Sequence, residues 1–218
     1  MAGIFDRPGQ ALRGISTVAG RYIIGDAPAH PGSNLFACRL RELSAHSFAV
    51  AAPVIPPVGE PVSAMFTPFG HLRGRVARQT ADGFVVAIAH GTGTREALRR
   101  RMAGFREGMW AGGSERRADR RHLPVEPRSV VQRPDGWAQP CLIVDYSASG
   151  AAVSAAYQPE VGEVVTLGRV TGVVARQFET GFAVKFFERH PAEDIEALLH
   201  APAQYDAVRA GEEVGAER

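Results

Sequence analysis

Residues 172–186 read GVVARQFETGFAVKF, and residues 74–88 read GRVARQTADGFVVAI. The two stretches share an Ala-Arg-Gln triplet and a Gly-Phe pair at an offset of 98 residues. A second match, at an offset of 103 residues, relates CRLRELSAHSFAVAAPV (38–54) to CLIVDYSASGAAVSAAY (141–157). Because the blocks occur in the same order, the chain is a tandem duplication whose first copy carries a five-residue insertion around 62–73.

Each copy has the pattern of a β-structure. Short runs rich in Val, Ile and Phe alternate with Gly, Pro and Asp, which predicts about six short strands per copy. The strand pattern alone fits both a small barrel and a sandwich. An amphipathic helix is predicted after each copy. The first would be capped by Thr94, and the apolar stripes are Leu98, Met102, Phe105 and Met109 in the first helix and Ile195, Leu198 and Leu199 in the second.

The composition is that of an ordinary globular protein. The chain has 218 residues, of which 45% are apolar and 22% charged. It has no apolar run of the roughly 18 to 20 residues that a membrane span needs. The first residues lack the apolar region of a secretory signal, and two cysteines make no disulfide framework. We therefore expect a cytoplasmic protein. The spacing of the seven histidines does not favour a metal site.

Positive charge is concentrated in one part of the chain. Lys185 is the single lysine beside 24 arginines, which a GC-rich genome would explain for most of them. Residues 95–133 hold 11 arginines against five acids, a local net charge of +6, whereas the whole chain has a net charge of +2. Such a concentration favours an anionic partner at this stretch.

Two polar motifs lie in and after the basic stretch. Residues 116–121 read RRADRR and residues 145–150 read DYSASG. Two guanidinium groups four residues apart can bind a planar anionic ligand through paired hydrogen bonds. An Asp and a Ser two residues apart on an extended segment point to the same side, and a glycine allows close backbone approach.

In this order and at this separation, 24 residues from Arg121 to Asp145, RxxxR and DxSxxG resemble the signature of the PilZ family of bacterial receptors for cyclic di-GMP. The resemblance covers most of 115–187 and, more faintly, 20–90. It implies two tandem PilZ-like β-barrels, each followed by an α-helix. It also implies cyclic di-GMP as the ligand, with no cofactor and no metal. The implied ligand-binding residues are Arg116, Arg117, Arg121, Asp145, Ser147 and Gly150.

The register of the arginine motif has two solutions, Arg116/Arg120 and Arg117/Arg121. The second is preferred because in the family an apolar strand closely follows the second arginine, as 123–125 does here. Arg116 then directly precedes the motif. In the family a basic residue at that place accompanies binding of an intercalated ligand dimer, which implies two ligands per chain.

The first copy reads ExSxxS (42–47) where the second reads DxSxxG, and no RxxxR precedes it. We therefore expect a degenerate first barrel (1–93), a linking helix and linker (94–114), a ligand-binding barrel with its helix (115–200) and a polar tail (201–218). The expected function is a receptor that changes interdomain or partner arrangement, with a downstream protein partner and no enzymatic activity. The alternative is a ligand-blind module that docks an acidic partner. Nucleic acid is disfavoured by the low net charge.

Overall fold

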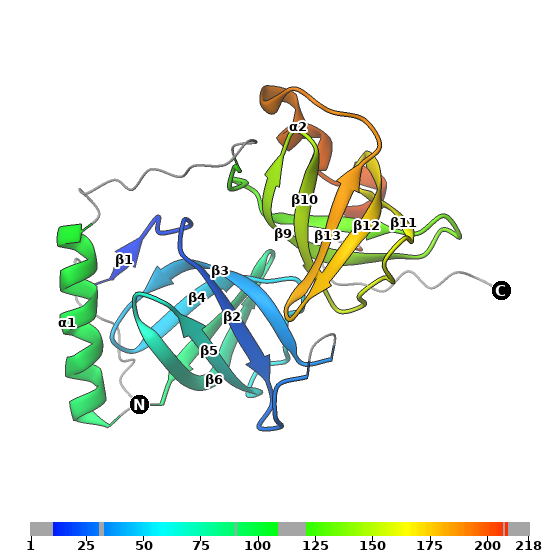
Figure 1. Ribbon diagram of the computed structural model, residues 1–218. Coiled ribbons are helices and arrows are strands. Elements are labelled where there is room, and N and C mark those ends of the chain that lie inside the picture. The colour runs from blue at the N-terminus through cyan, green and yellow to red at the C-terminus, as the bar shows by residue number, and fades with distance from the viewer. Residues whose placement is uncertain (1–10, 31–32, 90, 109–120, 207, 209–218) are drawn as a thin grey trace.

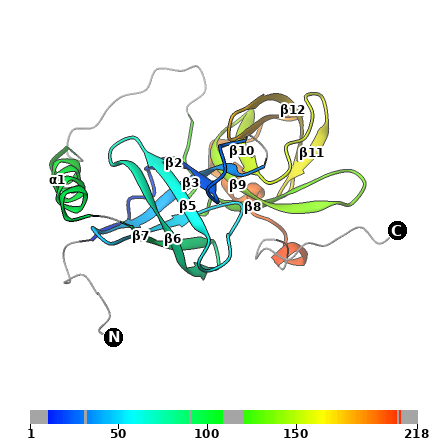
Figure 2. The ribbon, with the colours of Figure 1, turned by 90° about the horizontal axis from the view of Figure 1, so that it is seen from below.

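The computed structural model describes residues 11–30, 33–89, 91–108, 121–206 and 208. They form two antiparallel β-barrels side by side, each followed by a helix (Figure 1). The view from below shows helix α1 against the first barrel, on the side away from the second (Figure 2). The predicted fold class, mainly β with two tandem small barrels, is confirmed.

The first barrel is closed by a ring of six strands. β3, β2, β5, β6, β7 and β4 pair in this order, and β4 pairs back onto β3. A short additional strand, β1, pairs with the end of β3 that β2 leaves uncovered. The strand bounds are β1 Leu12–Arg13, β2 Ala19–Ile24, β3 Leu35–Leu43, β4 Ser47–Ala51, β5 Pro61–Phe66, β6 Gly70–Thr80 and β7 Gly83–Ile88.

The second barrel repeats this ring with the corresponding strands. β9, β10, β13, β12, β11 and β8 pair in this order, and β8 closes onto β9. The strand bounds are β8 Arg128–Gln132, β9 Ala138–Ser147, β10 Gly150–Ala155, β11 Val164–Leu167, β12 Val170–Phe178 and β13 Gly181–Phe186. Helix α2 (Ala192–Leu199) and a short 3-10 turn (Ala203–Tyr205) follow.

The shared Ala-Arg-Gln triplet serves the same structural role in both copies. Its alanine is an unpaired bulge residue in β6 and in β12, where the strand registers shift. Its glutamine then donates a hydrogen bond to a proline carbonyl: Gln79 to Pro56 at 3.0 Å, and Gln177 to Pro159 at 2.7 Å. The triplet therefore fixes a bulge and holds the neighbouring loop.

The shared Gly-Phe pair is explained by close packing of strands. A Cβ on Gly83 would lie 1.8 Å from the Val50 carbonyl oxygen, and one on Gly181 would lie 1.9 Å from that of Val153. The phenylalanine that follows is fully buried in each core. Both residues of the pair are thus required by the barrel, whether or not a ligand binds.

The five-residue insertion lengthens the hairpin between β5 and β6, and α1 packs on it. Phe69 in this hairpin lies 5.0 Å from Phe105 of α1 between ring centroids, and Arg101 donates a 2.8 Å hydrogen bond to the Phe69 carbonyl. Leu98 and Met102 are buried in the same contact, as the predicted apolar stripe requires. The helix spans Thr92–Gly108, so Thr94 is inside it and does not cap it; Met109 is outside the described residues.

The two barrels meet through corresponding strands, β3 and β9. Ala37, Ala51, Leu142 and Val144 form a small apolar cluster at this contact. The backbone N–H of Ala37 donates to the hydroxyl of Ser154 at 3.0 Å. At the edge of the contact, an ion pair joins Arg21 of the first barrel to Glu179 of the second at 2.6 Å.

The cysteines lie at corresponding core positions of the two barrels. Cys38 and Cys141 are both buried and free. Burial raises the pKa of the Cys38 thiol well above its usual value and that of Cys141 to about 12. A neutral, enclosed thiol is a small apolar core residue.

Candidate functional site

The DxSxxG residues lie at one end of the second barrel, where β9 turns into β10. Asp145 and Ser147 are on β9, and Gly150 begins β10. The Ser147 hydroxyl accepts from the Ser149 N–H at 3.4 Å and donates to the Gly150 carbonyl at 3.4 Å. These long hydrogen bonds keep the hydroxyl at the tight turn, on the half-buried surface.

Arg121 and Asp145 are brought together by the fold. The Nη1 atom of Arg121 donates to both carboxylate oxygens of Asp145, at 2.9 and 3.1 Å. The side chains are 37% and 22% exposed, so the pair is open to solvent on one side. Both bonds use the same nitrogen, which differs from the two-nitrogen fork that an arginine makes with a bound carboxylate.

The segment that follows Arg121 is held against the barrel by backbone and side-chain contacts of residues that the motifs do not specify. The His122 N–H donates to the Tyr146 carbonyl at 2.8 Å, and the Tyr146 N–H returns a 3.0 Å bond to His122. The two rings also stack, with centroids 5.6 Å apart. This single bridge corresponds to the pairing of β1 with β3 in the first barrel.

Glu196 of α2 completes this attachment. It accepts a 2.8 Å hydrogen bond from the Tyr146 hydroxyl and a 2.6 Å bond from the Val125 N–H. Burial, and then the hydrogen bond and charge of Glu196, raise the pKa of Tyr146 to about 12. No sequence pattern marked His122, Tyr146 or Glu196, because each contact joins segments distant in the chain.

The apolar strand expected directly after the arginines is absent. Between Arg121 and the start of β8 at Arg128, the only β pairing among the described residues is the bridge from His122 to Tyr146. Leu123 and Val125 are 44% and 72% exposed. These side chains do not enter the core, because the backbone there is fixed by isolated hydrogen bonds and not by a strand ladder.

Gly150 has no space for a side chain in the second barrel. A Cβ at this position would lie 2.5 Å from the Val184 carbonyl oxygen on the neighbouring strand β13. The sequence interpretation had assigned the glycine to close ligand approach, and strand packing is a second and sufficient reason for it. Arg116, Arg117 and Arg120 are outside the described residues, so the structure places only the second arginine of the motif.

The first barrel has a counterpart of the ion pair. Arg13 of β1 donates to Glu42 at 3.1 Å, and Glu42 occupies the position of Asp145. The Ser44 hydroxyl accepts from the Ser47 N–H at 3.0 Å, much as Ser147 accepts at its own turn. Ser47 stands where the second copy has Gly150. The degenerate copy thus keeps an arginine–carboxylate pair while lacking the motif.

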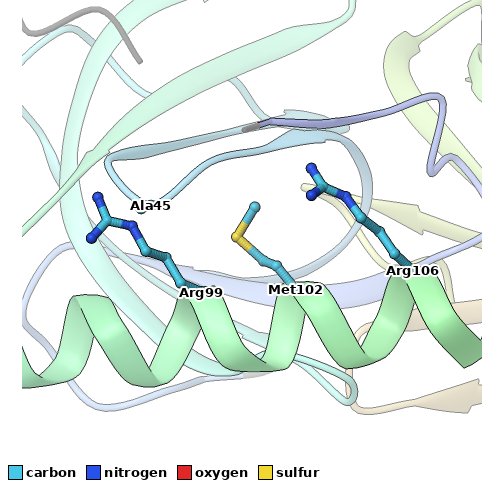
Figure 3. Close-up of a pocket in the computed structure, with 4 residues that line it drawn as sticks. All are labelled: Ala45, Arg99, Met102 and Arg106. Carbon is cyan, nitrogen blue, oxygen red and sulfur yellow. The ribbon is translucent and has the colours of Figure 1, made fainter. Parts of the chain in front are cut away.

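A cavity of about 170 Å³ lies beside this turn, lined by Ala45, Arg99, Met102 and Arg106. The last three project from one face of α1 toward the loop that carries Ala45 (Figure 3). Arg99 also contacts Glu96 at 3.6 Å. Two cations therefore flank a small apolar floor at the degenerate end of the first barrel.

A larger hollow, of about 330 Å³, lies on the outside of the first barrel between loop 25–29 and the strands of the longer hairpin. Ser63, His71 and Arg73 line it. Burial lowers the pKa of His71, and the neighbouring Arg73 cation lowers it further. The hollow therefore places a histidine and an arginine of the longer hairpin beside loop 25–29.

Neither a metal cluster nor a membrane span is found in the described part of the chain. No group of three or more His, Cys, Asp or Glu side chains there could hold a metal ion. No helix among the same residues is long and apolar enough to cross a membrane.

No protein-family model matches the chain, and no curated protein sequence matches it significantly. Solved structures do match. The PlzA protein of Borreliella burgdorferi in complex with c-di-GMP is 11% identical, with 92% of this chain and 94% of that chain covered and a TM-score of 0.27. The inhibitor of motility MotI/DgrA of Bacillus subtilis is 18% identical, with 89% and 96% covered and a TM-score of 0.26. YcgR of Escherichia coli in complex with c-di-GMP is 10% identical, with 85% and 82% covered and a TM-score of 0.25.

Proposed function

We propose that the chain is a PilZ-family receptor for cyclic di-GMP, a cytoplasmic bacterial protein that binds the dinucleotide at its second barrel and is not an enzyme. One observation carries the proposal: Arg121 and Asp145, from the two halves of the signature, meet at 2.9 Å at the end of β9. The division into 1–93, 94–114, 115–200 and 201–218 is part of the proposal.

The chemistry of the pair suits guanine. A guanidinium donates to guanine O6 and N7 together, and a carboxylate accepts from N1–H and N2–H. On binding, Arg121 and Asp145 would therefore exchange their ion pair with each other for hydrogen bonds to the edge of a guanine base. Opening the ion pair costs little, because a pair exposed to this extent is worth about 0–1 kcal/mol. Arg116 and Arg117 would meet the phosphates and the second base.

Binding would draw residues 111–120, which precede the attached Arg121, onto the second barrel and change the surface offered to a protein partner. A ligand shifts such an equilibrium only by its differential affinity for the two arrangements. Separation of the barrels would expose the apolar cluster at their contact and break the hydrogen bonds that cross it. This favours a change of partner arrangement over a separation of the barrels. The hollow lined by Ser63, His71 and Arg73 is the proposed place of contact.

Isothermal titration of the full chain with cyclic di-GMP tests the proposal, with GTP and cyclic di-AMP as controls. Saturable binding that selects cyclic di-GMP supports it. The absence of heat and of a thermal shift at high ligand concentration would overturn it. The number of ligands per chain tests the role given to Arg116.

The alternative function, a ligand-blind module that docks an acidic partner, is favoured by one observation. Arg99 and Arg106 flank the cavity beside α1 (Figure 3), and the same helix carries Arg95, Arg100 and Arg101. Charge reversal at both positions should abolish partner binding under this alternative and leave cyclic di-GMP binding unchanged under the first proposal.

A further inference from the structure

Arg39 is a buried cation in the contact between the barrels. It lies on β3 between Cys38 and Leu40, which belong to the first core, so its own side chain leaves the barrel. Even so, Arg39 is only 1% exposed, because the second barrel covers it. A charged side chain at such a position is costly unless it has specific partners.

The partners of Arg39 come from both barrels. Its Nη1 donates to the Ser16 carbonyl at 3.2 Å, and its Nη2 donates to the carbonyl of Val144 on β9. Its buried Nε has no hydrogen-bond partner among the described residues. The planar group therefore bridges the barrels through its two terminal nitrogens.

Val144 directly precedes Asp145 and is the bulged residue of β9. The register shifts there, so that Asp145 pairs with Ala152 and Ile143 pairs with Val153. A bulge sets the direction of the residues beside it and leaves its own residue without a cross-strand partner. The bond from Arg39 therefore holds the backbone at the point from which Asp145 projects.

Electrostatics agree with this placement. Burial lowers the pKa of the Arg39 guanidinium, and the nearby Arg41 cation lowers it further, while the Asp145 carboxylate acts in the opposite direction. The Asp145 carboxylate thus favours the charged form of Arg39 across the contact.

We propose that Arg39 of the first barrel is a positioning residue for the ligand site of the second barrel, holding the Val144 carbonyl so that Asp145 is directed at the ligand. This rests on the proposed function. The first barrel then contributes to ligand affinity although it lacks the signature. By reciprocity, ligand bound at Asp145 strengthens the contact between the barrels.

Arg128 provides a matched control. It is 4% exposed and crosses the same contact in the other direction, donating to the Ala52 carbonyl of the first barrel at 3.1 Å. It pairs along β8 with Leu142, three residues before Asp145. Arg39→Met and Arg128→Met each remove one buried cation that bridges the barrels. Of the two arginines, only Arg39 donates a hydrogen bond to the Val144 carbonyl, directly before Asp145.

Both variants are titrated with cyclic di-GMP beside the wild type, and their thermal unfolding is recorded. Arg39→Met is expected to weaken binding by about tenfold, a coupling of the size found between contacting residues. Arg128→Met should stay within about twofold, although both variants should lose stability. If Arg39→Met does not unfold cooperatively, Arg39→Lys replaces it, since one ammonium cannot span both carbonyls.

Amide hydrogen exchange gives a readout that a purely structural role would not change. Cyclic di-GMP should slow exchange at Ala37, whose N–H crosses the contact to Ser154, in the wild type and not in Arg39→Met. Equal affinity of wild type and Arg39→Met, or equal losses in both methionine variants, would overturn the inference alone. No binding by the wild type would overturn the proposed function and the inference with it.

Discussion

One guanidinium nitrogen of Arg121 contacts both carboxylate oxygens of Asp145, across 24 residues of chain. Arg13 and Glu42 make a similar pair in the first barrel, at 3.1 Å. An arginine–carboxylate pair at this end is thus common to both copies. What distinguishes the second copy is Gly150, where the first copy has Ser47, and the arginines before Arg121.

Arg121→Ala and Asp145→Ala should each weaken cyclic di-GMP binding by about 1–3 kcal/mol, the range for a bidentate guanine contact. Stability should change by less than about 1 kcal/mol, because the pair is partly exposed. Titration calorimetry and urea unfolding measure the two effects. Arg13→Ala, which removes the first-barrel pair, is the control and should leave binding unchanged. Wild-type affinity in both second-barrel variants would show that the ligand site is elsewhere.

Arg116→Ala should reduce the ligand stoichiometry from two to one per chain. A basic residue directly before the motif supplies a further guanidinium to a second, stacked dinucleotide. Calorimetry at protein concentrations above the dissociation constant gives the ratio. A wild-type ratio of one would remove the role proposed for Arg116 and leave that of Arg121 intact.

Tyr146→Phe should lower the free energy of unfolding by about 1 kcal/mol at neutral pH through the lost hydrogen bond to Glu196. The pKa of Tyr146 is raised from 10.0 to about 12, so the folded state keeps a proton that the unfolded state has lost. The contribution of Tyr146 is therefore complete below pH 10 and disappears between pH 10 and 12.

Urea unfolding of both proteins at several pH values measures this contribution, and the difference between wild type and variant isolates Tyr146 from the other tyrosines. That difference should shrink as the pH rises from 10 to 12. A difference that stays constant to pH 12 would contradict the assignment.

Gly181→Ala should destabilise the second barrel by about 3 kcal/mol, the upper range for overpacking, because its Cβ would lie 1.9 Å from the Val153 carbonyl oxygen. Gly104→Ala is the matched control. Nothing lies within 4 Å of a Cβ there, and alanine favours the helix by about 1 kcal/mol over glycine. The midpoint of thermal unfolding should therefore fall in Gly181→Ala and rise in Gly104→Ala. Equal shifts would mean that β10 and β13 can separate without cost.

The repeat predicted two tandem β units, since the residues it preserves are those that build each barrel, and the family resemblance supplied the choice of a barrel over a sandwich. Gln79 and Gln177 hold loops, and Gly83 and Gly181 allow strands to approach, so both copies keep them. The prediction of a strand at 123–125 was wrong, because local apolar character does not reveal which backbone groups find ladder partners.

The candidate site was only partly predictable. The spacing of the two motifs predicted Arg121 and Asp145 as site residues, and in the structure the two form an ion pair. Glu196 and Arg39 reach the site through tertiary contacts that leave no trace in local sequence. Among 24 arginines, nothing in the pattern separated Arg39 from those on the surface.

The contact between β3 and β9 joins corresponding positions of the two copies. Arg39 and Leu142, which both lie in the contact, occupy the same position in the two copies. The two copies therefore meet through equivalent strands, as the subunits of an isologous dimer do about a two-fold axis. The chain has the architecture of a covalently fused dimer, in which one half carries the DxSxxG motif and the other does not.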